Sequence, residues 1–212
     1  MSRGRLVAAA AVGGVLLLAL GVLIGRLLTP AAVAPSTDSA AAGFLRDMQV
    51  HHAQAVQMAL LVRDRTDDET IRTIAYDMAV TQATQSGAMY GLLEAWDLPQ
   101  RSPGEPMAWT ELPPIDGSDG GGHQMDPAAP AGMPGMASTA QLAELEAATG
   151  DDAVRIFLTL MIAHHQGGLD MAEAVLARTD VPQVLDLANG IQRSQSAEIT
   201  VMQDLLARLP PS

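Results

Sequence analysis

The sequence has 212 residues, enough for one domain with a substantial core and flanking segments. Only six residues are aromatic, which favours packed helices over sheets. Acidic residues outnumber basic ones 24 to 12, a balance that argues against nucleic-acid binding through phosphates. The sequence has no Cys, which excludes disulfides, thiolate metal sites and thiol nucleophiles, so any soft-metal chemistry depends on Met and His.

The first 26 residues form a candidate membrane anchor. Leu6 to Ile24 is a run of apolar residues and Gly about long enough to span a bilayer as a helix. The Arg residues before it predict a cytoplasmic N-terminus, with the rest of the chain outside the cell membrane. The alternative is a cleaved signal peptide and a secreted domain, because Ala32-Val33-Ala34 resembles a cleavage site. We favour the single-pass anchor because the apolar run is longer than most signal cores. Residues 27–39 then read as a tether.

Residues 40–212 are predicted to form the folded domain as two helical hairpins. The first hairpin covers 40–97 and the second covers 139–209, where Pro210-Pro211 ends the last helix. Thr66 to Glu69 resembles a capping box that begins the second helix. Residues 98–138 between the hairpins are rich in Pro and Gly and predict a long mobile loop.

A repeated stretch relates the two hairpins. The pattern F-L-x-x-M-x-x-H-H-x-x-small-x-x-M-A occurs at residues 44–59 and again at 157–172, an offset of 113. The same offset relates residues of the helix that follows each copy: Arg65 and Arg178, Gln82 and Gln195, Gln85 and Glu198, Met89 and Met202. Two such hairpins with a long crossover predict an all-α four-helix bundle.

The repeated His and Met residues share one face of each helix. At 100° per residue, Met48, His51, His52 and Met58 fall within a stripe about 120° wide. A symmetric hairpin would place the His pair opposite residues 78–80. Buried imidazoles need partners, because an unpaired buried polar group costs about 1–3 kcal/mol. Asp47 is also spaced to pair with His51, although the second copy has no counterpart.

The donor types on this face favour a soft metal ion. Imidazole and thioether together select Cu(I) above other ions. The predicted metal ligands are Met48, His51, His52, Met58, Met161, His164, His165 and Met171. Candidate accessory ligands are Met89, Met202 and the loop residues His123, Met125, Met133 and Met136. In Gly- and Pro-rich sequence these loop methionines have no evident packing role, so they suggest soft-metal capture or a partner surface, with a disordered linker as the alternative. Gln82 and Gln195 are predicted to orient the imidazole N–H groups as second-shell acceptors.

These paired Met-x-x-His-His blocks, each followed by a helix with Gln-x-x-(Glu/Gln)-x-x-x-Met, resemble the ferritin-like domain-of-unknown-function family that includes the periplasmic copper-binding protein CopM. The resemblance covers residues 40–209. It implies a ferritin-like four-helix bundle outside the cytoplasm that binds copper through the eight Met and His ligands named above. Gly167-Gly168, after the second His pair, is expected to loosen that helix and to make the two sites unequal.

Three functions compete on these observations. The first is a membrane-anchored copper-binding protein for storage, resistance or delivery. The second is a di-iron or other ferritin-like oxidase, which the missing Glu-x-x-His motifs disfavour. The third is a metal-free helical module that docks on an envelope protein or on a second copy of the chain. The sequence shows no nucleophile–base pair and no phosphate loop, so we predict no enzymatic activity.

Overall fold

The computed structural model describes residues 34–118 and 132–210, together with residues 4, 12–15, 17–21 and 23. It divides into two compact units, Met1–Ala34 and Pro35–Ser212. The described residues contain helices and no strand, which confirms the all-α class. Among these residues, no helix is both long and apolar enough to cross a membrane. Part of the predicted anchor lies outside them, so the anchor stays a prediction.

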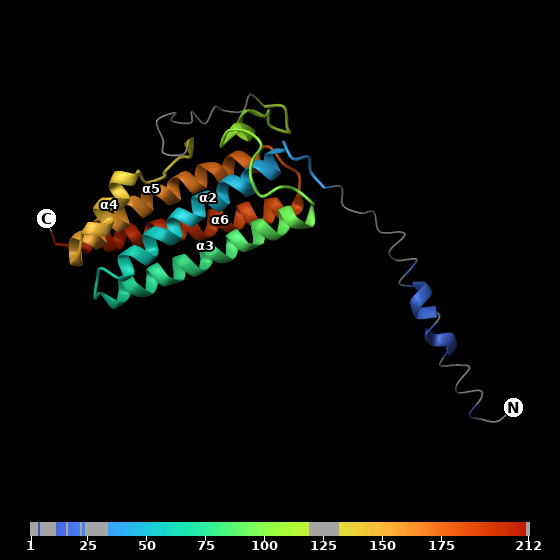
Figure 1. Cartoon of the computed structure of the whole chain (residues 1–212), viewed down its shortest axis with the longest axis horizontal. Helices are drawn as coiled ribbons and strands as arrows, with labels where there is room; N and C mark the ends of the chain where they lie inside the picture. Colours follow the sequence, from blue (N-terminus) through green and yellow to red (C-terminus); the bar gives the residue numbers. More distant parts are fainter. Residues whose placement is uncertain are drawn as a thin grey trace. The chain divides into compact units, whose positions relative to one another are not determined.

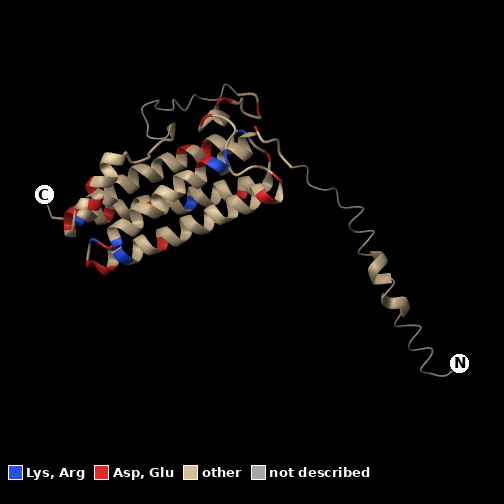
Figure 2. Ribbon diagram, in the orientation of Figure 1, with Lys and Arg blue, Asp and Glu red and all other residues tan. Residues whose placement is uncertain are grey.

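Four long helices build the second unit (Figure 1). The first hairpin consists of α2 (Ala40–Arg63) and α3 (Glu69–Ala95), and the second of α5 (Gly150–Leu176) and α6 (Pro182–Arg208). The hairpins join mainly where α2 packs against α5. The short helix α4 (Thr139–Ala147) packs on both of these helices. Asp and Glu gather toward the ends of the bundle (Figure 2).

Side-chain caps define where the first two helices begin. The Ser39 hydroxyl accepts a hydrogen bond from the Ala42 amide at the start of α2. At α3 the cap is Asp68, whose carboxylate accepts from the amides of residues 70 and 71. The predicted capping box at Thr66 is therefore wrong, and the Thr66 hydroxyl instead accepts from the Asp68 amide. An Asp carboxylate at the N-terminus also interacts favourably with the helix dipole.

Helices α2 and α5 run antiparallel at the centre of the bundle. The amide that begins α5, at Gly150, donates to the carbonyl of Arg65 just beyond the end of α2. Two apolar clusters lie along this pair. One contains Met48 and Met171, and the other contains Met58 and Met161. The His pairs lie between these clusters in sequence on both helices, so each His pair has one methionine before it and one after it.

The first part of the crossover (residues 98–138) is fixed to α2 by Asp47. The Asp47 carboxylate accepts from the Met107 amide at 2.7 Å and from Trp109 Nε1 at 2.9 Å. Trp109 lies in the 3-10 helix η1 (Ala108–Glu111) and packs over Gly43, where an added Cβ would lie 2.5 Å from the indole. The predicted Asp47–His51 pair is therefore wrong, because the crossover occupies the carboxylate.

The last part of the crossover is also packed against the bundle. The Gln54 side chain accepts from the Ala137 amide at 2.7 Å and donates to the Ala137 carbonyl at 2.9 Å. Met133 is buried, and Met136 is half-buried against the same apolar cluster. The prediction that these two methionines lack a packing role is thus wrong. His123 and Met125 lie outside the described residues.

Helix α5 is continuous through its paired glycines. A Cβ at Gly167 would lie 2.0 Å from the carbonyl oxygen of Pro134, and a Cβ at Gly168 would lie 2.3 Å from Gln195 Oε1. Real Cβ atoms do not approach so closely, so Gly167 leaves room for the crossover backbone and Gly168 for a side chain of α6. The expectation that these glycines loosen the helix is therefore wrong.

Candidate metal centre

The two predicted His pairs come together in one histidine cluster, made of His51 and His52 from α2 and His164 and His165 from α5. All four side chains are 0% exposed. The ring centroids of His51 and His164 are 3.7 Å apart, with an angle of 33° between the ring planes. The centroids of His164 and His165 are 6.3 Å apart. The antiparallel packing of α2 on α5 therefore makes one centre where the sequence shows two separate motifs.

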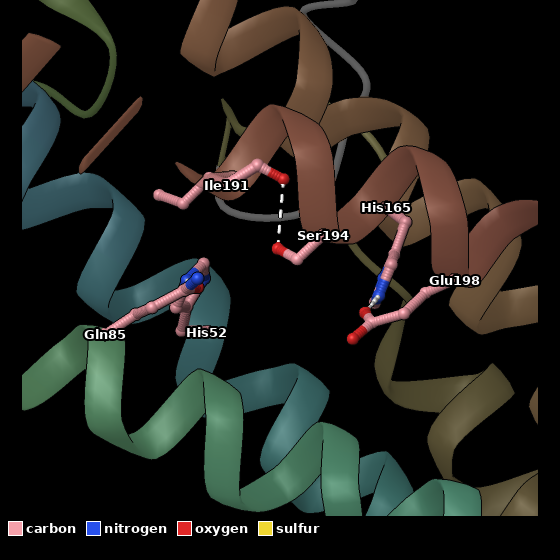
Figure 3. Close-up of polar contacts among 6 residues, drawn as sticks. All are labelled: His52, Gln85, His165, Ile191, Ser194 and Glu198. Atoms are coloured by element: carbon pink, nitrogen blue, oxygen red, sulfur yellow. Dashed lines mark hydrogen bonds and ion pairs between the residues drawn. The ribbon is translucent and has the colours of Figure 1, made fainter. Parts of the chain in front are cut away.

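Two hydrogen bonds in the cluster follow the internal repeat (Figure 3). His52 Nε2 lies 2.7 Å from Gln85 Oε1, and His165 Nε2 lies 2.6 Å from Glu198 Oε2. Both partners lie 33 residues after their His and one helical turn beyond the predicted Gln82 and Gln195. These two glutamines are buried, but among the described residues their side-chain oxygens have no hydrogen-bond partner. The sequence shows that Gln85 and Glu198 correspond in the repeat. It does not show the register of the two helices in each hairpin, which determines that these residues are the partners of the histidines.

The cluster departs from the repeat at His51 and His164. His51 Nε2 donates to the carbonyl oxygen of Pro134 at 3.0 Å. A carbonyl oxygen only accepts, so Nε2 carries the proton and Nδ1 of the neutral ring keeps a lone pair. Sequence reasoning missed this contact, because nothing in the loop marks which carbonyl will reach the core.

Several ring nitrogens in the cluster have no partner. Within the part of the chain that the structure describes, no hydrogen bond reaches Nδ1 of His51, His52 or His165, or either ring nitrogen of His164. Unpaired buried polar atoms cost free energy, and in native proteins they need an explanation such as a bound ion. The cluster thus brings together several buried ring nitrogens that have no hydrogen-bond partner and could bind a metal ion.

Burial keeps these rings neutral. It lowers the pKa of His51 to about 4, partly offset by the hydrogen bond to Pro134. Burial and the neighbouring His51 lower the pKa of His52 to about 3. Burial, with His51 and His165 nearby, holds the pKa of His164 well below its usual value. At neutral pH these three rings are therefore unprotonated, which is the form that binds metals.

The comparisons with known proteins identify the family. Residues 41–206 match the family model described as a domain of unknown function, DUF305. The chain belongs to the DUF305 family. This confirms the resemblance seen in the sequence. No protein of curated function matches the chain.

Solved structures of the family share the fold. A DUF305 protein from Streptomyces coelicolor is 45% identical, with a TM-score of 0.70, over 81% of this chain and 94% of that one. A DUF305 fragment from Deinococcus radiodurans is 35% identical, with a TM-score of 0.61, over 78% and 94%. CopM in its Cu(I)-bound form is 23% identical, with a TM-score of 0.55, over 76% and 91%. At that identity the CopM likeness shows the fold alone.

Methionines of this DUF305 domain lie on both sides of the histidine cluster. The four predicted methionine ligands are 0% exposed. Each apolar cluster takes one of them from either half, and each also contains predicted accessory methionines. Met89 and Met133 lie in the cluster of Met48, and Met202 lies in that of Met58. Thioether sulfur from both halves is thus buried along the same helix pair as the histidines.

Proposed function

We propose that this DUF305 domain binds copper, with Cu(I) favoured, and that it serves copper storage, resistance or delivery outside the cytoplasm from a single N-terminal anchor. The observation that carries the proposal is the set of unpartnered imidazole nitrogens at the centre of the bundle. The apolar N-terminal run supports the anchor. The proposal includes no catalytic step.

The hydrogen bonds of the cluster suit metal binding. A His that ligates a metal usually donates its other N–H to a carbonyl or carboxylate oxygen, which fixes the ring orientation. His51, His52 and His165 each have such an oxygen at Nε2, from Pro134, Gln85 and Glu198. Their Nδ1 atoms are the ones without partners. In each of these three rings Nε2 is thus anchored to the protein, and Nδ1 is the nitrogen that would bind a metal ion.

The donor types favour Cu(I) over harder ions. Among the described residues, no group of three or more His, Asp or Glu side chains is arranged to hold a metal by itself. Buried methionine thioethers lie along the same two helices as the imidazoles, and that combination of groups suits soft Cu(I) better than Zn²⁺. The family adds support, because CopM has been solved with Cu(I) and with Cu(II).

A Cu(I) competition titration tests the proposal. Residues 35–212 form a compact unit and can be used without the leading segment. The fragment is titrated anaerobically against a coloured Cu(I) chelator, beside a variant with His51, His52, His164 and His165 changed to Gln. We expect tight binding by the parent and at least a 100-fold loss of affinity in the variant, because second-shell changes alone already cost about 10–100-fold.

A second variant guards against a misfolded His variant. Met48, Met58, Met161 and Met171 are changed to Leu, which keeps side-chain volume and usually costs less than about 1.5 kcal/mol per site. This variant should fold and lose Cu(I) affinity, whereas Met107→Leu, at a buried methionine outside the predicted set, should bind like the parent. Equal Cu(I) affinity in all of these proteins would overturn the proposal.

Exposed apolar side chains favour the metal-free docking module as a second candidate. Tyr76, Val80 and Tyr90 on α3 and Val201 on α6 are each about half exposed. Such residues suit contact with an envelope partner or with a second copy of the chain. The titration separates the candidates, because a docking module has no need to bind copper.

A further inference from the structure

A groove between α3 and α6 leads toward the histidine cluster. It encloses about 210 Å³ at the seam where the outer helices of the two hairpins meet. Its lining comes from both halves of the molecule: Ile74, Asp77 and Met78 of α3, and Ala197, Glu198 and Val201 of α6. Asp77, Ala197 and Val201 are exposed, so the groove opens to solvent.

Glu198 connects this groove to the buried centre. Its side chain is 24% exposed, and its Oε2 lies 2.6 Å from Nε2 of His165, whose side chain is 0% exposed. Figure 3 shows this carboxylate beside His165, and its partial exposure means that it also reaches solvent. Met78 also lines the groove, although it is only 2% exposed, so it lies on the inner side.

These three residues line the groove with two carboxylates and one thioether, groups that attract or bind a soft cation. The exposed Asp77 carboxylate attracts positive charge, and the domain as a whole is strongly acidic. The Met78 thioether favours Cu(I) over hydrated hard ions. The Glu198 carboxylate is in direct contact with His165, so an ion bound by this carboxylate would lie next to the histidine cluster.

The internal repeat provides a comparison within the same chain. At the offset of 113, Gly190 corresponds to Asp77, Ile191 corresponds to Met78, and Gln85 corresponds to Glu198. The equivalent place beside His52 therefore has neither a charge nor a thioether from these positions. Only one of the two places related by the repeat, the groove beside His165, therefore has these charged and thioether side chains.

Another surface groove does not share these features. It lies between α5 and α6 and is acidic through Asp170 and Glu173, with Arg193 also in its lining. No histidine of the cluster and no methionine lines it. It is therefore acidic without offering a route inward.

We propose that the groove between α3 and α6 is the entrance through which Cu(I) reaches the histidine cluster, with Asp77, Met78 and Glu198 as a transient entry site. This inference rests on the proposed copper-binding function. The ion exchanges ligands from carboxylate and thioether to imidazole with no change of oxidation state. An entry site changes the rates of uptake and release together and leaves the affinity nearly constant.

Stopped-flow measurement of Cu(I) transfer from a coloured chelator to residues 35–212 tests the entrance. The main variant combines Asp77→Asn with Met78→Ile, which places in α3 the residue type found at the corresponding position of α6. We expect uptake and release each to slow about tenfold, with affinity within about threefold of the parent. Raising the salt concentration should reduce the contribution of Asp77 to the rate of Cu(I) uptake, because salt screens the attraction between exposed charges.

The matched control is Asp170→Asn with Met107→Leu, which removes the same chemical groups away from the groove. It should transfer Cu(I) at the parent rate. An unchanged uptake rate in the groove variant overturns the entrance. Lower affinity through faster release alone would make Met78 a resident ligand and would also overturn it. Absence of Cu(I) binding by the parent would instead refute the proposed function itself. Thermal unfolding by circular dichroism verifies that each variant is folded.

Discussion

The two hairpins carry the same histidine pair but use the surrounding positions differently. The first hairpin holds the crossover with polar side chains: Asp47 binds its first part, and His51 and Gln54 bind its last part. In the second hairpin the residues corresponding to Asp47 and Gln54 are Leu160 and Gly167. Gly167 contributes space, since the crossover backbone passes directly over it. At these corresponding positions the first hairpin supplies hydrogen bonds and the second supplies space, although Arg178 of the second hairpin also donates to the Leu112 carbonyl of the crossover.

A second difference concerns the partners of the buried rings. His52 has the neutral amide of Gln85, and His165 has the carboxylate of Glu198. The shared geometry lies where the halves meet, at the α2–α5 contact, and the differences lie toward the crossover and the outer helices. The internal repeat therefore accounts for the histidine cluster, and the positions at which the two copies differ account for the side chains around it.

The largest predicted effect is the loss of stability of the metal-free protein in acid. Unfolded His protonates near pH 6.5, whereas His51 and His52 have pKa values of about 4 and about 3 in the fold. The unfolded state thus takes up protons first, and stability present above pH 6.5 is lost as pH falls toward 4. We expect each ring to contribute a loss of about 3 kcal/mol over this range. Urea unfolding at a series of pH values measures it.

Substitutions in each half of the repeat show which histidines cause the loss of stability in acid. Changing His51 and His52 together to Gln should lower the pH slope of the unfolding free energy by close to two protons between pH 4 and 6.5. His164→Gln should lower it by close to one, because burial also depresses the pKa of His164. A slope unchanged by both sets would show that these rings are not buried in neutral form.

Adding one methyl group at Gly167 should have the next largest effect. In Gly167→Ala the Cβ meets the Pro134 carbonyl, so the crossover must move and the His51 hydrogen bond is lost. We expect a loss of about 1–3 kcal/mol in the free energy of unfolding by urea, the usual range for overpacking. Gly87→Ala in α3 is the matched control, because open space surrounds that position. It should stabilise the protein by about 0.5–1 kcal/mol. Equal behaviour of the two variants would contradict the close approach at Gly167.

Making the halves more alike should have the smallest effect. Gln85→Glu places beside His52 the carboxylate that His165 already has. A nearby negative charge favours the protonated ring, so we expect the pKa of His52 to rise by about one unit or more. Imidazole NMR signals followed against pH measure the change, with Glu198→Gln as the reverse substitution. A pKa of His52 that stays near 3 would show that position 85 does not set the charge around this ring.

The sequence predicted the helices and the repeat well because both follow from local patterns. Apolar periodicity and the F-L-x-x-M-x-x-H-H blocks indicate the helical hairpins and place the His pairs on a buried face. The predicted partners Gln82 and Gln195 lie one turn from the observed Gln85 and Glu198. That choice depends on the register of each hairpin, which the geometry of the connecting turn sets and no pattern in the helices encodes.

The crossover was the least predictable part for a related reason. Its Pro- and Gly-rich composition indicates an irregular chain, and an irregular chain can still be held firmly by a few long-range contacts. Trp109 on Asp47 and Ala137 on Gln54 join residues more than 60 positions apart. Spacing along the sequence carries no information about such pairs and predicts for Asp47 only the nearer partner, His51.

The glycine at position 167 also provides a way to classify relatives by reading a single alignment column. It follows the first histidine of the second pair by three residues. Where a DUF305 sequence has Gly there, a proline-rich connection can rest on the helix and offer a backbone carbonyl to the first histidine of the first pair. Where it has a larger residue, that connection must stand away, and the first histidine of the first pair loses this acceptor. The family should therefore divide into closed and open members at this column, and under the proposed copper-binding function the two groups should differ in how readily a small chelator removes Cu(I).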